Sequence, residues 1–217
     1  MPVHRGRIEA IRLVGGATCL DFVNTANGRR QDGTLPTLEE SLCGPLDVAA
    51  WALRAELLTL KEHSSMLVEV VSDPDAAARA YTRLIVFREA LYRLFETLAV
   101  DQSKDPIGLD HINAALSQTA GLRQIAAHED HFDWAWRTPS EPDCMFDAIV
   151  GKVAISAAEL LVNGEISKLR ICDFSECDWV FLDTSKNGRR RWCQMDVCGN
   201  RAKARRRAHL LPVSDSE

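Results

Sequence analysis

Apolar residues recur along much of the chain at the three- and four-residue steps that are typical of α-helices. The clearest run follows Asp73-Pro74, where the aspartate is expected to be the N-cap and the proline the first helical residue, and it continues as far as Leu98. The same spacing predicts three further helices, over residues 46–60, 106–117 and 145–162. The last is apolar throughout and ends at Asn163-Gly164, so we expect it to be buried.

Short apolar or alternating stretches predict β-hairpins between these helices. Residues 8–14 and 18–23 flank Gly15-Gly16, and residues 122–126 and 131–136 flank a polar turn at 128–130. Residues 24–45 contain Asn-Gly, Asp-Gly and Gly-Pro pairs, which favour a loop. We therefore predict a mainly α fold with small β-hairpins (α+β).

Length and composition agree with a soluble globular protein. The chain has 217 residues, 46% hydrophobic and 26% charged, which is enough for one large domain or a core with a small appendage. No apolar run approaches the roughly 20 residues of a membrane-spanning helix, and the polar N-terminus has no signal-peptide core. We expect a cytoplasmic protein that does not contact membranes.

The charge is divided unevenly along the chain. Residues 168–209 hold eleven Lys and Arg against five Asp and Glu, a net +6, although the whole chain carries −5. The first 167 residues are correspondingly acidic, at −9. A basic end on an acidic body indicates a nucleic-acid or other anionic partner, whereas the simpler interpretation is a solvated basic tail.

Four of the seven cysteines lie close together near the C-terminus, with the spacing C-x4-C, fifteen residues, C-x4-C. Two pairs of thiolates suit the tetrahedral preference of Zn²⁺, and four protein ligands make a closed, structural site. An iron–sulfur cluster, disulfides and free thiols are the alternatives. The predicted zinc ligands are Cys172, Cys177, Cys193 and Cys198.

The residues between and after the cysteine pairs predict the form of the module. We expect residues 179–182 to pair with 191–192 across an Asn187-Gly188 turn. A basic helix should follow over residues 201–209, with Ala204 and Ala208 packed against the hairpin. This order is that of a treble-clef-like zinc finger. Phe174, Trp179, Phe181 and Trp192 are expected to pack in its core.

Eight cations within nineteen residues are candidates for phosphate contacts, because the guanidinium group of arginine can bond two phosphate oxygens at once. Solvated charge without a partner is the simpler alternative. The predicted nucleic-acid contacts are Arg189, Arg190, Arg191, Arg201, Lys203, Arg205, Arg206 and Arg207.

Two segments resemble known families. Residues 169–207, with Cys-Gly-Asn-Arg at 198–201, are similar to the CGNR zinc finger, whose four cysteines and basic positions Arg190, Arg191, Arg201 and Lys203 are all present. Residues 16–25, GATCLDFVNT, resemble the start of the ABATE domain that usually precedes it. The resemblance implies a bacterial, stress-responsive transcriptional regulator with a helical ABATE-like domain at residues 1–165 and a DNA-binding finger at 166–212.

The N-terminal domain offers a second candidate site. Asp21 and Asn24 are polar residues in the apolar stretch that we expect to be a strand, where they could contact a ligand or cap the strand end. Nucleotide-binding and hydrolase motifs such as G-x-x-x-x-G-K-[ST] and G-x-S-x-G are missing from the sequence, so we do not expect an enzyme.

The sequence thus favours a regulator that binds double-stranded DNA through a structural zinc finger and a basic helix. Its N-terminal domain would sense a small-molecule effector or form a homodimer, which would double the contact of one small finger. An RNA-binding or ribosome-associated protein is the first alternative. An interaction module with a purely structural zinc finger is the second.

Overall fold

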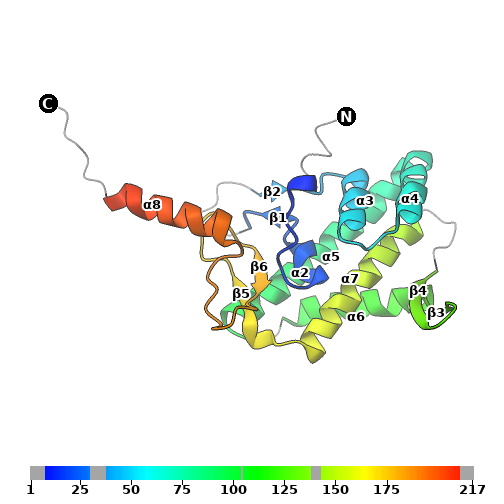
Figure 1. The fold of residues 1–217 in the computed structure, drawn as a ribbon. Coiled ribbons are helices and arrows are strands. Elements are labelled where there is room, and N and C mark those ends of the chain that lie inside the picture. The colour runs from blue at the N-terminus through cyan, green and yellow to red at the C-terminus, as the bar shows by residue number, and fades with distance from the viewer. Residues whose placement is uncertain (1–7, 30–37, 104, 138–142, 211–217) are drawn as a thin grey trace.

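The computed structural model describes residues 8–29, 38–103, 105–137 and 143–210, the last range without the side chains of residues 143, 144, 209 and 210. Three long helices pack together: α5 (Pro74–Val100), α6 (Pro106–Thr119) and α7 (Asp143–Asn163). The short α2 (Thr18–Val23) lies against α5 and α7, and α3 (Pro45–Arg54) and α4 (Leu60–Ser72) pack on α5 (Figure 1). The predicted mainly α class with small hairpins is confirmed.

The long helices begin within two residues of the predicted starts. Asp73 caps α5 by accepting the backbone N–H of Ala76 at 2.9 Å, with Pro74 at the first position. The apolar stripe from Leu84 to Leu98 is buried in the main core. Gly108 lets α6 approach α5 closely, because a Cβ there would lie 2.6 Å from Cβ of Leu94.

The predicted hairpin at residues 8–23 is wrong, because α2 occupies its second half and residues 8–10 form a helical turn. All apolar side chains of α2 are buried, and a short buried helix has the same continuous apolar pattern as a buried strand. Helix α4 was not predicted, although Thr59 and Glu62 form a capping box at its start, recognisable in the sequence as T-x-x-E.

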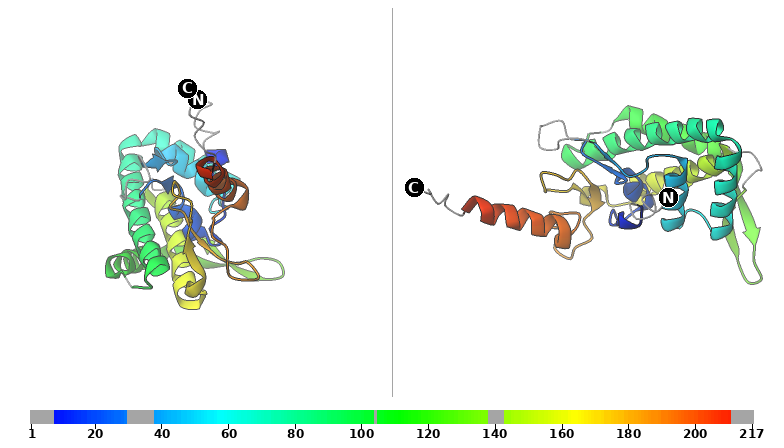
Figure 2. Two further views of the ribbon diagram at one scale, coloured as in Figure 1. Left: turned by 90° about the vertical axis from the view of Figure 1, so that its left-hand side faces the viewer. Right: turned by 90° about the horizontal axis from the view of Figure 1, so that it is seen from above.

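The other small sheets are two-stranded and antiparallel. β3 (Arg123–Ala127) and β4 (Phe132–Trp136) form the predicted hairpin, which projects from the body at the end opposite α8 (Figure 2). Two-residue strands β1 (Ala26–Asn27) and β2 (Glu39–Glu40) pair within the segment predicted to be a loop. None of the described helices has both the length and the apolar character needed to cross a bilayer.

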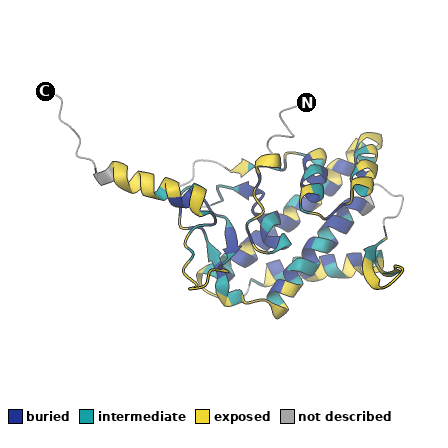
Figure 3. Ribbon diagram, viewed as in Figure 1, coloured by how far each residue is buried: buried dark blue, intermediate teal, exposed yellow. Residues whose placement is uncertain are grey.

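The C-terminal residues fold directly onto the helical body. β5 (Leu169–Ile171) and β6 (Val180–Leu182) pack on α5, and Leu169 and Val180 belong to the main hydrophobic core. A separate small core surrounds the four clustered cysteines with Phe174 and Phe181. From it α8 (Asn200–Leu210) extends away from the body with nearly all its described side chains exposed (Figure 3).

Candidate metal centre

The first cysteine pair lies in the turn that joins β5 to β6. These strands pair in the register Leu169↔Leu182 and Ile171↔Val180. Cys172 follows β5 directly, and its N–H donates to the carbonyl of Trp179 at 2.9 Å. The N–H of Cys177 donates to the carbonyl of Phe174 at the same distance, which closes a tight loop and turns both sulfurs to one side.

The second pair comes from the segment that leads into α8. Cys198 lies in a single π-helical turn, Met195–Gly199, which is closed by the N–H of Gly199 donating to Gln194 at 3.0 Å. A Cβ at position 199 would lie 2.6 Å from Sδ of Met195, so a larger residue would fit there only if the Met195 side chain moved. Asn200 bonds back to the carbonyl of Asp196 at 3.0 Å and joins the turn to the helix.

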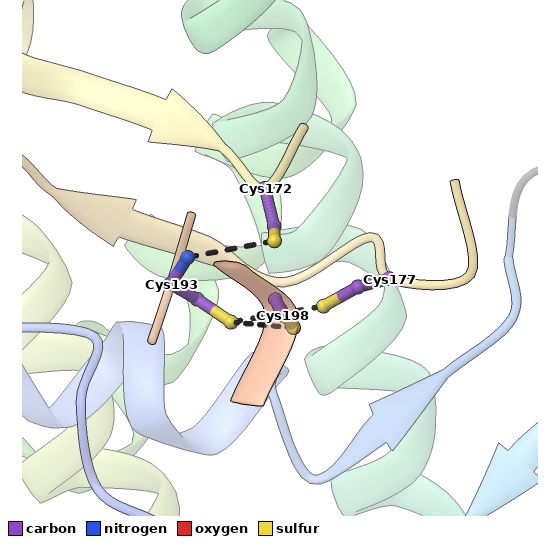
Figure 4. A group of neighbouring side chains, drawn as sticks. All are labelled: Cys172, Cys177, Cys193 and Cys198. Carbon is purple, nitrogen blue, oxygen red and sulfur yellow. Dashed lines mark hydrogen bonds between the residues drawn. The ribbon is translucent and has the colours of Figure 1, made fainter. Parts of the chain in front are cut away.

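The four buried thiols converge on one point (Figure 4). Their sulfurs lie within 4.8 Å of one another, with 3.8 Å between Cys177 and Cys193 and 3.6 Å between Cys193 and Cys198. A tetrahedral ion with bonds of about 2.3 Å to sulfur would hold its ligands about 3.8 Å apart. The distances exceed the roughly 2.05 Å of a disulfide. The cluster therefore fits one tetrahedral metal ion, of which Zn²⁺ is the usual example.

The surroundings of the cluster favour a thiolate on Cys172 in particular. Hydrogen bonds from the thiols of Cys177, Cys193 and Cys198 lower the pKa of Cys172 well below its ordinary value, whereas hydrogen bonding to Cys172 raises the pKa of Cys177 and of Cys193. Cys172 also accepts the N–H of Cys193 at 3.4 Å. A metal must displace the thiol protons, so a preformed thiolate helps binding at neutral pH.

The hairpin predicted between the cysteine pairs is wrong, because the strand at residues 180–182 has a different partner. β6 pairs with β5 rather than with residues 191–192, and residues 183–194 form a loop. Buried Asp183 organises this loop, since its carboxylate accepts the N–H groups of Ser185 and Arg190, both at 2.9 Å. The predicted Asn187-Gly188 turn is present, with Gly188 at φ +60°. The aromatic residues of the module pack in its small core as predicted.

Three predicted nucleic-acid contacts bind other groups of the protein. Arg190 is half-buried over the ring of Phe181 and donates to the carbonyls of Trp192 and Cys193. Arg191 pairs with Asp173 at 2.7 Å. Arg205 lies 5.3 Å from the Phe174 ring centre and bonds Ser175 and Glu176, which fastens α8 to the first cysteine loop.

The predicted alanine face of α8 is wrong. Ala202 packs on the small core, whereas Ala204 and Ala208 are exposed, because the helix touches the module only through its first turns. The remaining predicted contacts are exposed cations: Arg189 lies in the loop, and Arg201, Lys203, Arg206 and Arg207 lie on α8.

Asn24 lies where the body meets the cysteine hairpin. Its side-chain amide donates to the carbonyl of Val180 at 2.8 Å and accepts the N–H of the same residue at 2.9 Å, as a neighbouring strand would. The side-chain amide of Asn27 likewise donates to the carbonyl of Glu176 and accepts the N–H of Asp178, both at 3.0 Å. A ligand-contact role for Asn24 stays a prediction, and it would require this pairing to break.

We expect Asn24→Ala to destabilise the protein by about 2–3 kcal/mol, because both buried polar groups of Val180 lose their partner. Denaturant unfolding at fixed zinc would measure this. Asn27→Ala, at a half-buried position, is the matched control and should cost less. Equal stability of Asn24→Ala and the wild type would contradict a docking role for this pairing.

Four further residues contribute to the docking, and the sequence pattern did not single them out for this. The carboxylate of Asp178 accepts the backbone N–H of Arg29 at 2.5 Å, and its carbonyl accepts the Tyr92 hydroxyl at 3.2 Å. The Arg29 guanidinium lies 4.1 Å from the Tyr92 ring centre and pairs with Glu89. The residue after Cys177 is therefore held by β1 and α5 together.

Asp21 supports the contact between the body and β6 indirectly, through the backbone of Gly15. Its carboxylate accepts the N–H of Gly15 at 2.8 Å, and the carbonyl of Gly15 accepts the N–H of Leu182 at 2.8 Å. Gly16, at φ +88°, lies against Leu182, with only 3.3 Å between Cβ of Leu182 and the place a Cβ would take on the glycine. Burial raises the pKa of Asp21 to about 6. The geometry gives Asp21 a structural role, and ligand contact by this residue also stays a prediction.

The stability that Asp21 contributes should therefore fall as the pH rises from about 4 to 6, because the folded state holds the Asp21 proton that the unfolded chain has released. The effect is at most about 3 kcal/mol. Asp21→Asn keeps an acceptor for Gly15 without the charge, so the difference in unfolding free energy between variant and wild type should grow across this range. A difference that is independent of pH would contradict the raised pKa.

Comparison with family models gives two matches. Residues 168–209 match the CGNR zinc finger, and residues 16–164 match the ABATE model, described as "Putative stress-induced transcription regulator". A search of curated proteins gives no match. The two matched segments meet at the end of α7, just before the cysteine hairpin begins.

Proposed function

The chain belongs to the ABATE family and carries a CGNR zinc finger, and from this premise we propose that it is a transcriptional regulator that binds double-stranded DNA through α8. Residues 166–212 would be the DNA-binding part and residues 1–165 the part that holds it. Such a regulator would act in the bacterial cytoplasm, where thiols stay reduced. A homodimer and a small-molecule effector stay predictions.

The observation that carries the proposal is an exposed basic helix fixed at one end to a metal site. α8 starts within two residues of Cys198, and Arg205 anchors it to the first cysteine loop. Beyond these contacts it projects into solvent, as a helix must to enter the major groove (Figure 1). Zn²⁺ bound by the four cysteines would hold the base of the helix in place.

Lys203 and Arg207 lie four residues apart on one side of α8, and Arg206 lies beside them. Ala202 marks the side that faces the module. Lys203 and Arg207 therefore point away from the docking contacts. Arg206 lies on the side of Ala202, one turn further along, but it is also exposed, so these three cations are the best candidates for phosphate contacts. Arg189 of the neighbouring loop is exposed and would extend the surface. We leave Arg190 and Arg191 out, because their guanidinium groups bond the module itself.

The test is binding of the zinc-loaded full-length protein to duplex DNA across a salt series. The variant Lys203→Gln, Arg206→Gln, Arg207→Gln should bind more weakly, and its log–log salt slope should fall by about three. Lys61→Gln, Arg79→Gln, Arg93→Gln removes the same charge from exposed positions on the body and should change little.

Equal weakening by both variants would mean that net charge, rather than α8, drives binding. Unchanged binding by the α8 variant would overturn the proposed interface. Structured RNA in the same assay separates the first alternative function: competition by RNA at lower concentrations than DNA would favour an RNA-binding protein.

A further inference from the structure

A cavity of about 240 Å³ lies between the body and the cysteine module. β1, β2 and the N-terminal segment line one side through residues such as Ala26, Glu39 and Arg12. Cys177, Cys193 and Cys198 line the other side, so a small solute in this cavity reaches three of the four sulfur-bearing residues.

The sulfurs differ in their exposure to this cavity. Cys172 does not line it, is fully buried, and accepts a backbone N–H. Cys177 and Cys198 are each 6% exposed. Hydrogen bonding to a metal-bound sulfur reduces its electron density, and burial excludes reagents, so Cys172 is the protected ligand. Cys177 and Cys198 are the accessible ligands, and Cys193 lies closer to Cys198, at 3.6 Å, than to Cys177, at 3.8 Å, which favours Cys193 and Cys198 as the pair that reacts.

Four thiolates around Zn²⁺ carry a net charge of about −2, which leaves them electron-rich. We propose that Cys193 and Cys198 are a reversible oxidation site for hydrogen peroxide or a small organic peroxide that enters through this cavity. The inference rests on the proposed zinc site but does not depend on DNA binding.

The chemistry takes two steps. The Cys198 thiolate attacks one peroxide oxygen, the O–O bond breaks, and the departing oxygen leaves as water or an alcohol after taking up a proton, with a sulfenic acid formed on Cys198. The Cys193 thiolate then attacks that sulfur, an S–S bond forms, and the hydroxyl group leaves as water after taking up a second proton. The two sulfurs lose two electrons and the peroxide gains them.

The consequence for the fold follows from the position of Cys198. Two of the four ligands are lost together, so Zn²⁺ is released. The π-helical turn must then shift, because the two sulfurs move from 3.6 Å to about 2.05 Å apart. α8 begins at this turn and loses its fixed base. A thiol reductant with Zn²⁺ would restore the site.

The test exposes zinc-loaded full-length Cys43→Ser protein to hydrogen peroxide, since Cys43 is an exposed thiol away from the site. Released zinc is followed with a colorimetric chelator, and the disulfide is located by mass spectrometry. We expect zinc release in step with a Cys193–Cys198 disulfide, and recovery after dithiothreitol and zinc are added.

Cavity variants test the route. Two single variants, Ser41→Phe and Glu39→Trp, place a larger side chain in the cavity lining, the second at an exposed position. Each should slow zinc release several-fold and leave the zinc affinity unchanged. Unchanged rates in both variants, a first disulfide that includes Cys172 or Cys177, or zinc that stays bound under peroxide would each overturn the inference. A protein that holds no zinc before peroxide is added would instead overturn the proposed metal.

Discussion

Cys198→Ser is expected to abolish stable zinc binding and to unfold the C-terminal module while the helical body stays folded. A serine hydroxyl does not ionise near neutral pH, so the site keeps only three thiolates. The small core around the cysteines has few other apolar residues, chiefly Phe174 and Phe181. In modules of this kind, metal binding supplies about 10–16 kcal/mol of folding free energy.

The measurements are zinc stoichiometry and hydrogen exchange along the chain. Exchange should rise most in α8 and least in residues 176–180, whose backbone is held by Asn24 and Asn27 of the body. Cys43→Ser is the matched control, because this exposed thiol lies outside the cluster, and it should keep its zinc. Full zinc occupancy in Cys198→Ser would mean that Cys198 is not a required ligand.

Patterns whose cause is local were predictable from the sequence. The Asp73 cap and Pro74 fix the start of α5 without help from distant residues, and the apolar stripe that follows gives its buried face. The cysteine spacing likewise predicts convergence of the sulfurs, because each pair is held in one short loop or turn. For the same reason the β3–β4 hairpin was found from alternation and a polar turn.

Features whose cause is a distant contact were not predictable. Asn27-Gly28 is a turn signal in sequence, yet the Asn27 amide pairs with backbone that lies 149 residues away. Arg190 belongs to a run of three arginines, and only the fold reveals that it packs on Phe181. The segment after β6 was expected to return as a strand, but the buried carboxylate of Asp183 bonds the N–H of Arg190 within a loop.

These distant contacts give the N-terminal motif a structural meaning. Within residues 16–25, Asn24 pairs with β6, and the Thr25 hydroxyl bonds the carbonyl of Phe22 and accepts from Arg88. The motif thus builds the surface on which the cysteine hairpin docks. Docking restrains the first cysteine loop before metal binds, so the body should raise zinc affinity above that of the isolated finger.

Glu40→Leu is expected to destabilise the protein by about 3 kcal/mol, because it leaves a buried guanidinium without its main partner. Arg88 is 1% exposed and pairs with Glu40 through both terminal nitrogens, at 2.7 and 2.5 Å. Glu89 also contacts Arg88, at 2.8 Å, which keeps the expected cost at the lower end for a broken buried pair.

Glu89 also links this pair to the metal module, since it binds Arg29, whose backbone N–H bonds Asp178 beside Cys177. Denaturant unfolding of Glu40→Leu should therefore show a lower midpoint for both the body and the cysteine hairpin. Glu39→Leu, the exposed neighbour, should cost much less. Combining Glu40→Leu with Arg88→Met removes both charges and should recover much of the loss. If the double variant is less stable than Glu40→Leu alone, the cost of that substitution does not come from the unpaired arginine.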